Sequence, residues 1–240
     1  MTTGRPRGMT APATVAGAFL ATVAVLDVVR VWAISTEASI LRAVRDGAPF
    51  SLSDAHASDA RLGVLTAGYV VLLIGSGVAW CVWQHRAHAN LRAFARSGLR
   101  FTPGWAVGWW FVPIASLWEP FEAVRELWKA SDPGSDAVSW RSIRTWPTLG
   151  WWWFCWLGSG VISAVGSAQR GTDLDDTIRG DTIVMAALAL QVVAAVLAIA
   201  IVRQVVARQT ALALTGAGTP GPPPMPPPAL PMPPLPTPLD

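Results

Sequence analysis

Four long apolar runs constrain the fold more than any other feature of the sequence. They lie at about residues 12–34, 62–84, 148–168 and 181–203. Each is long enough to cross the hydrocarbon core of a bilayer, about 30 Å thick, as a helix. Charged residues make up only 14% of the chain, well under the roughly 25% typical of soluble domains. These features predict an all-α integral membrane protein with four transmembrane helices.

The first run begins like a signal peptide, because Arg5 and Arg7 precede it in a short terminus of residues 1–11. Its apolar stretch continues to about residue 34, however, which is longer than the apolar part of a typical signal peptide. We therefore interpret it as an uncleaved first helix. The membrane domain is expected to cover residues 12–205.

Three polar residues within the apolar runs are candidates for an intramembrane site: Asp27, Arg30 and Gln191. Asp27 and Arg30 are three residues apart and share a helix face. They form either a local ion pair, with Arg30 reaching to the interface, or a polar site that faces the bundle interior. Gln191 lies near the middle of the fourth run, where a hydrogen bond between helices is expected.

The second run continues without a helix breaker as far as Gly98. Its apolar residues keep helical spacing and form one face: Trp83, Ala87, Leu91 and Phe94. Its basic residues form the other face: His85, Arg86, Arg92 and Arg96. This pattern predicts an amphipathic helical extension out of the membrane.

Residues 101–118 differ from the four runs, because tryptophans alternate there with helix breakers. The part from Trp105 to Trp118 contains 14 residues, or about 21 Å of helix, and Pro113 lies inside it. It is too short and too broken for a normal span. We expect a segment that is re-entrant or that lies in the membrane interface.

A short amphipathic helix is predicted at residues 120–131. Pro120 suits its first turn, and Phe121, Val124 and Trp128 share an apolar face. The other face is charged: Glu122, Arg125, Glu126 and Lys129. A helix of this kind typically lies in the surface of a membrane.

The distribution of Lys and Arg predicts the orientation of the chain. With four spans, the N-terminus, the connection 84–147 and the C-terminal tail share one side and hold 12 basic residues, against five in the two opposite loops. Positive residues mark the cytoplasmic side, so both termini are expected in the cytoplasm. A fifth span at 101–118 would remove this bias, with eight basic residues against nine.

Tryptophan is distributed just as unevenly. Of the 14 tryptophans, only Trp32 lies near the outer end of the predicted bundle, whereas aromatic belts normally occur at both interfaces. The excess predicts a platform at the inner leaflet, built from the extension of the second run, residues 101–118 and the start of the third run. Its expected partners are anionic lipids of that leaflet or a protein. The basic residues lie beside apolar spans, which does not indicate nucleic-acid binding.

The C-terminal segment 216–240 contains 12 of the 20 prolines. Such a segment cannot pack a core and is expected to be extended and disordered. It is either a plain spacer or a peptide ligand for a proline-binding partner.

No motif in the sequence specifies a reaction or a cofactor. His85 and His88 are three residues apart and could ligate a metal, but a third ligand at suitable spacing is missing. The motifs of serine hydrolases, nucleotide-binding loops and dinucleotide-binding folds are absent from the sequence. We therefore expect a protein that is not an enzyme and that needs no metal or cofactor.

The central part of the chain resembles a known family in three motifs. They are W-x-x-R-x-x-x-N from Trp83 to Asn90, P-G-W-A-V-G-W-W-F-x-P-x-x-x-L-W-x-P from Pro103 to Pro120, and R-E-L-W-x-A-S from Arg125 to Ser131. This pattern resembles the bacterial membrane-protein family catalogued as domain of unknown function 4328, over about residues 60–205. The resemblance implies a multi-span membrane protein and supplies no substrate, cofactor or catalytic residue.

Two functions remain open for a multi-pass protein of the bacterial cell membrane. The first is a non-enzymatic interaction or regulatory module, whose platform binds a protein partner or lipid headgroups. The alternative is a small transporter or channel in which the broken segment from Trp105 to Trp118 lines a pathway. The candidate platform residues are Trp83, Arg86, Asn90, Pro103, Gly104, Trp105, Gly108, Trp109, Trp110, Pro113, Trp118, Pro120, Glu126 and Trp128.

Overall fold

The computed structural model describes residues 6–49, 52–171 and 173–215. Over these residues the chain is helical and contains no strand, as predicted. Four helices are long: α1 (Thr10–Arg45), α2 (Leu52–Ala93), α5 (Pro147–Gln169) and α6 (Leu174–Thr215). Short elements connect α2 to α5: α3 (Pro103–Gly108), η1 (Trp109–Phe111), η2 (Ala115–Leu117), α4 (Glu119–Ala130) and η3 (Ser139–Ser142). The proline-rich segment 216–240 lies outside the described residues.

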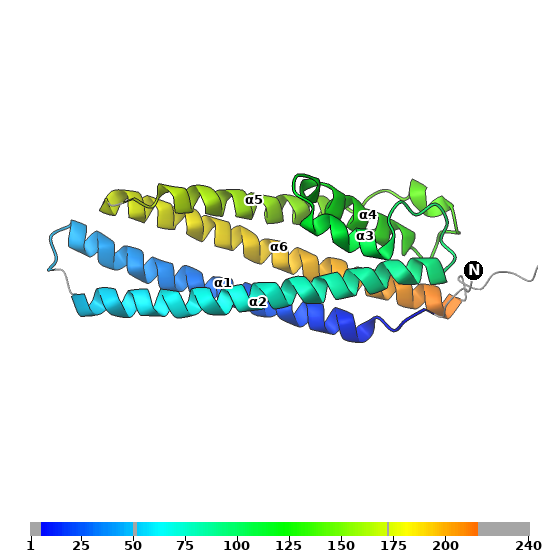
Figure 1. The fold of residues 1–240 in the computed structure, drawn as a ribbon, viewed down its shortest axis with the longest axis horizontal. Coiled ribbons are helices and arrows are strands. Elements are labelled where there is room, and N and C mark those ends of the chain that lie inside the picture. Colours follow the sequence, from blue (N-terminus) through cyan, green and yellow to red (C-terminus); the bar gives the residue numbers. More distant parts are fainter. Residues whose placement is uncertain (1–5, 50–51, 172, 216–240) are drawn as a thin grey trace, which may run out of the picture.

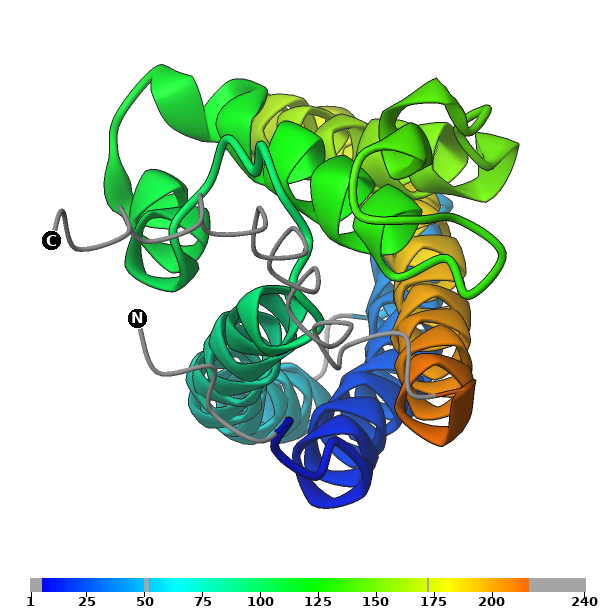
Figure 2. The same cartoon turned by 90° about the vertical axis from the view of Figure 1, so that its right-hand side faces the viewer.

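The long helices form an arc rather than a closed bundle. Helix α1 packs against α2 on one side and α6 on the other, and α6 packs against α5. Helices α2 and α5 therefore form the two ends of the arc, as the view along the bundle shows (Figure 2). The short elements gather at one end of the molecule, where α2 ends and α5 begins (Figure 1).

Three helices within the described residues are long and apolar enough to cross a membrane: α1, α2 from His56 onward, and α6. The fourth predicted span coincides with α5, which is 23 residues long. Four tryptophans occupy its first half and several glycines and serines its second half, so its hydropathy is lower than that of the other three. The structure thus supports three of the four predicted spans by length and composition.

Two of these helices are much longer than a bilayer requires. Helices α2 and α6 each contain 42 residues, or about 63 Å, roughly twice the thickness of the hydrocarbon core. Helix α1 also continues beyond residue 34, the predicted end of the first span, as far as Arg45. The chain then turns at Gly47, whose φ is 97°. None of these helices contains a proline beyond its first turn, so nothing in the backbone ends them at the membrane boundary.

Small residues let α5 and α6 approach closely at the end away from the short elements. A Cβ atom added at Gly166 would lie 2.9 Å from the carbonyl oxygen of Gly180, and one added at Gly180 would lie 2.7 Å from that of Gly166. With no side chain on either glycine, the backbones of the two helices can come this close.

Candidate functional site

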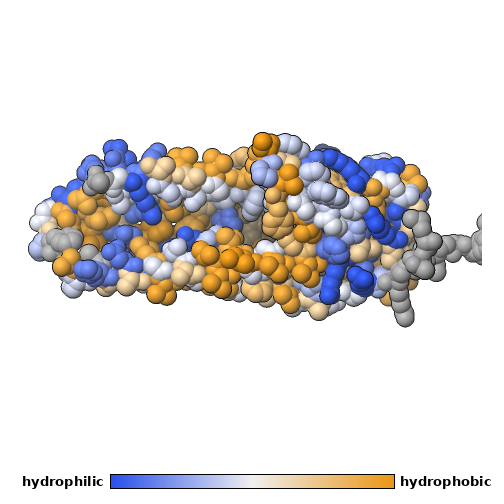
Figure 3. Space-filling view, viewed as in Figure 1, coloured by the Kyte–Doolittle hydropathy of each residue, from blue (hydrophilic) through white to orange (hydrophobic). Residues whose placement is uncertain are grey.

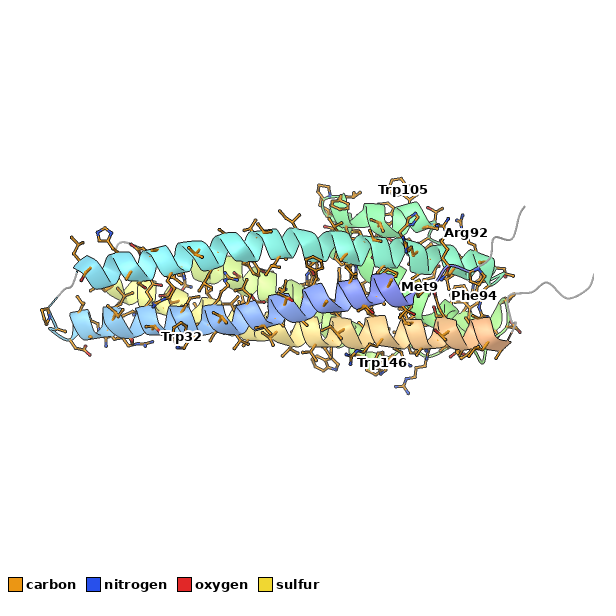
Figure 4. The ribbon with its side chains drawn as sticks, turned by 90° about the horizontal axis from the view of Figure 1, so that it is seen from below. Met9, Trp32, Arg92, Phe94, Trp105 and Trp146 are labelled. Atoms are coloured by element: carbon orange, nitrogen blue, oxygen red, sulfur yellow. The ribbon has the colours of Figure 1, made fainter. Side chains whose placement is uncertain are left out.

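Residues 94–146 fold over one end of the four long helices, and we refer to them as the tryptophan cap. The cap contains α3, η1, η2, α4 and η3. It packs against the last turns of α2 and α6 and the first turns of α5 (Figure 1). Trp105 and Trp146, both in the cap, lie far along the molecule from Trp32 (Figure 4).

The first part of the cap is broken into short pieces, as its prolines predict. Thr102 caps α3, because its hydroxyl oxygen accepts a hydrogen bond from the backbone N–H of Trp105 over 3.2 Å. Pro103 occupies the first turn, and the helix ends after six residues. Beyond η1, Pro113 precedes Ile114, whose φ of 67° is rare for a β-branched residue. The segment is therefore divided into short turns and does not form a regular span.

Gln84 attaches this broken segment to α2. Its buried side-chain oxygen accepts hydrogen bonds from the indole N–H groups of Trp80, at 3.0 Å, and Trp110, at 2.9 Å. Its side-chain nitrogen donates to the carbonyl oxygen of Ala106 in α3 over 3.1 Å. One amide thus links α2, α3 and η1, and three polar groups are satisfied inside an apolar region.

Tryptophans from three elements form an aromatic cluster around Trp110. Its ring lies 5.9 Å from that of Trp153 and 5.3 Å from that of Trp156, both in α5. Trp80 of α2 contacts Trp110 and also Trp152, whose ring lies 5.4 Å away. Much of the tryptophan-rich sequence is therefore packed between α2 and α5, the two ends of the arc. Fewer tryptophans than expected are exposed on the predicted platform.

Helix α4 packs one face against the bundle, with Val124, Leu127 and Trp128 buried. Glu126 was expected on the charged face, but it is buried as well. Its carboxylate accepts the backbone N–H groups of Arg100, at 2.7 Å, and Phe101, at 3.1 Å. Burial raises the pKa of Glu126, and these two donors offset part of that effect. The glutamate therefore fixes the chain where it enters α3.

Trp128 holds the end of α4 against α6. The guanidinium of Arg208 lies 3.6 Å from the centre of its ring and donates to its carbonyl oxygen over 3.0 Å. The same guanidinium lies 3.4 Å from the carboxylate of Asp132. Trp128 also stacks with Trp146, and the centres of the two rings are 6.1 Å apart.

Asn90 connects α2 to two distant segments. Its side chain accepts from the backbone N–H of Arg7 over 2.8 Å and donates to the carbonyl oxygen of Arg7 over 2.9 Å. It also donates to Gln209 of α6 over 3.1 Å, and Gln209 in turn donates to the carbonyl oxygen of Ala87 and to the hydroxyl of Ser131. The motif residue Asn90 thus has a structural role, and Arg86 lies on the exposed face of α2.

Between Trp105 and Trp118 the cap exposes five large apolar side chains, and we refer to this set as the apolar edge: Trp105, Phe111, Ile114, Leu117 and Trp118. Phe111 is 75% exposed and Ile114 is 72% exposed, the highest values among the large apolar residues of the cap. The backbone behind this edge is fixed, because the indole N–H of Trp153 donates to the carbonyl oxygen of Leu117 over 3.1 Å. Gly104 and Gly108 lie in the turn of α3 behind Trp105.

A cavity of about 620 Å³ lies below the cap, between α2 and α5. Its walls come from all four long helices and from the segment Val107–Phe111, and they are almost entirely apolar. Figure 3 shows this face of the molecule hollowed between α5 and α2. Gln191 of α6 lines the cavity, and its side-chain oxygen accepts from the hydroxyl of Ser159 in α5 over 2.5 Å. The hydrogen bond between helices expected for Gln191 is therefore present.

Asp27 and Arg30 form an ion pair at 3.3 Å, one of the two arrangements expected from the sequence. Arg30 also covers the ring of Tyr69 in α2, at 4.2 Å. Asp27 is buried, but neither residue of the pair lines the cavity. The structure does not bring these two residues together with Gln191.

His85 and His88 do not converge on a common point. His85 is exposed, whereas His88 is buried with its Nδ1 3.1 Å from the carbonyl oxygen of Gln84. Within the described residues no group of three potential metal ligands occurs.

Four residues that hold the cap in place were not predicted from the sequence: Gln84, Arg96, Arg208 and Gln209. Arg96 was expected on the polar face of its helix, but its guanidinium donates to the carbonyl oxygens of Asp132, Ser135 and Asp136 beyond α4. A signal for Gln84 was present in the sequence. It is a polar residue one position after Trp83 and four after Trp80, on the face that the helix buries.

Comparison with known proteins finds one family. The family model described as "Domain of unknown function (DUF4328)" matches residues 46–207, more than half of the chain. No curated protein and no solved structure matches the chain.

Proposed function

We propose that this chain, which belongs to the DUF4328 family, is a non-enzymatic interaction module of the bacterial cell membrane. In this proposal the chain crosses the membrane four times, with both termini in the cytoplasm. The tryptophan cap then lies at the inner leaflet, where its exposed apolar edge binds lipid headgroups or a protein partner.

Helix α5 suits a fourth span in its charge and in its packing. No Asp, Glu, Lys or Arg occurs between Pro147 and Gln169, and 23 residues give about 35 Å of helix, which is enough to cross the core. Helix α5 packs along α6 and turns apolar side chains such as Phe154 and Val161 outward. Its low hydropathy comes from tryptophans and small residues, both of which are common in membrane helices.

The edge of the cap is the observation that carries the proposed function. Five large apolar side chains are exposed together on a segment that Gln84, Trp153 and Glu126 hold by hydrogen bonds. Exposed apolar groups on a fixed backbone favour association, because little conformational entropy is lost on contact. With this geometry we favour an interfacial position for residues 101–118, with the edge at the level of the headgroups.

The cavity bears on the alternative, a transporter or channel. A pathway for polar solutes needs polar groups that converge across the membrane. The walls of the cavity are apolar, and Asp27 and Arg30 lie outside them. These observations favour the interaction module over transport.

Capture from native membranes tests the proposal. The full chain is tagged and crosslinked in membranes, and the captured proteins and lipids are compared for the native chain, a Phe111→Ser/Ile114→Ser variant and a Val138→Ser control. Val138 is also an exposed apolar residue of the cap but lies outside the edge. We expect the edge variant alone to lose a captured species. Equal capture by all three chains would contradict the proposal, and a chain ending at residue 215 shows separately what the proline-rich segment contributes.

A further inference from the structure

We propose that the cavity between α2 and α5 binds one acyl chain of an inner-leaflet phospholipid. The inference uses the membrane topology proposed above, but it does not depend on what the apolar edge binds.

The lining of the cavity suits a hydrocarbon chain and little else. Side chains of Leu20, Val23, Ile74 and Val78 form much of its wall, with Ala195 at the back. The indole N–H groups of Trp80 and Trp110, which also contribute to the wall, are both occupied by Gln84. Ser76 and Gln191 add polar groups to the lining, and the oxygen of Gln191 is already bonded to Ser159. A polar ligand would therefore lose its hydration for few hydrogen bonds, whereas an apolar chain has no hydrogen bonds to lose on entering.

The size of the cavity suits a hydrocarbon chain. A helix with its side chains is at least about 10 Å wide, whereas an acyl chain is a single file of CH₂ groups and is much thinner. The cavity measures about 620 Å³, which is room enough for one such chain.

The cavity opens where a lipid chain would be. It lies at the open side of the arc, and the residues of α2 that line it, between Leu73 and Val82, belong to the half of the predicted span next to the cap. Ile74 and Val78 are both wall residues and exposed, so the opening faces the surroundings of α2. In the bilayer those surroundings are acyl chains. Trp110 and Phe111 close the end of the cavity towards the cap, near the level of the headgroups.

Photocrosslinking in vesicles tests this proposal. The full chain is reconstituted in phosphatidylethanolamine and phosphatidylglycerol, with a small fraction of phosphatidylglycerol that carries a diazirine in the middle of one acyl chain. Adducts are then mapped by mass spectrometry. Val23 and Ala195 line the cavity but are buried from the outer surface, so an adduct there requires a chain inside. Val71 and Val161 are exposed and report ordinary contact with the bilayer.

A glycine pair on α2 supplies the variant and its matched control. Gly77 lines the cavity and Gly68 does not, and a Cβ atom added at either meets no atom within 4 Å. We expect Gly77→Leu to lower the adducts at Val23 and Ala195 about tenfold, the effect of one or two methylene groups in an apolar pocket. Adducts at Val71 and Val161 should not change, and Gly68→Leu should behave as the native chain. If Gly77→Leu does not fold, Ala194→Phe is the second variant that fills the cavity, from the opposite wall, and the same loss of adducts is expected.

Three results would overturn the inference. The first is adducts confined to exposed positions, which would mean that only annular lipid contacts the protein. The second is adducts at Val23 and Ala195 that persist in both cavity variants. The third is crosslinks between two copies at the cavity, with lipid adducts missing there. None of these results depends on capture at the apolar edge, so this inference and the proposed function can fail separately.

Discussion

At the scale of single residues, the cap depends on a few buried polar side chains. Gln84, Asn90, Gln209 and Glu126 each hold backbone or indole groups that would otherwise be buried without partners. Buried polar groups with satisfied partners add little net stability, but breaking the set leaves groups whose desolvation is no longer compensated. Substitution at these positions should therefore cost more than the loss of a surface contact.

Gln84→Leu should destabilise the cap strongly. Leucine is of similar size, but it leaves the indole N–H groups of Trp80 and Trp110 and the carbonyl oxygen of Ala106 without their partner. The expected loss is about 3 kcal/mol, at about 1–3 kcal/mol for each buried group left unpaired. Denaturant unfolding followed by tryptophan fluorescence in a mild detergent measures it, because the affected indoles are the reporters.

The neighbouring exposed His85 gives the control for that measurement. His85→Leu should change stability by no more than about 0.5 kcal/mol, as surface substitutions usually do. If the two variants unfold alike, Gln84 does not hold the cap, and the attachment of η1 to α2 must come from aromatic packing alone.

At the scale of elements, the ends of α2 and α6 are held together outside the predicted spans. Gln209 of α6 reaches both α2 and the end of α4, through Ala87 and Ser131. Helices that continue beyond a bilayer lose the support of lipid and need contacts of their own. The hydrogen bonds of Gln209 meet that need for the last turns of α6.

Gln209→Leu should loosen the end of α6 without affecting its membrane part. Amide hydrogen exchange of residues 206–215 should become faster, while exchange of residues 185–200 stays as slow as in the native chain. Thr210→Val, at the exposed next position, is the matched control and should leave both regions unchanged. Faster exchange throughout α6 in the Gln209 variant would show that the helix loosens as one unit.

The sequence predicts these elements to different degrees. Periodicity and the absence of breakers place α2 and its extension, and the prolines predict the break between Trp105 and Trp118. The inward turn of Glu126 was not predictable, because its partners are the backbone N–H groups of Arg100 and Phe101, and contacts with a distant loop leave no periodic signal. The aromatic cluster was missed for a similar reason. Composition places the tryptophans at one end, but only tertiary packing decides that Trp80, Trp110 and Trp153 face each other.

At the scale of the whole molecule, an open arc is joined at one end by the aromatic cluster. Helices α2 and α5 meet there through Trp80 and Trp152, and the cavity separates them below it. The fold thus combines a rigid end with an apolar recess that opens to the side. Both proposals require that α5 cross the membrane beside α6.

Cysteine accessibility in whole cells decides this topology. The two native cysteines, Cys81 and Cys155, are first replaced by alanine. Single cysteines are then introduced at Arg7, Asp46, Val138, Gly171 and Leu214 and treated with a membrane-impermeant thiol reagent. Four spans with cytoplasmic termini predict labelling of Asp46→Cys and Gly171→Cys in intact cells, and of the other three only after the membrane is permeabilised. If α5 did not cross, Gly171→Cys would behave as Val138→Cys does, and Leu214→Cys would be labelled from outside. The full inverse pattern would place the tryptophan cap at the outer leaflet, against the distribution of Lys and Arg.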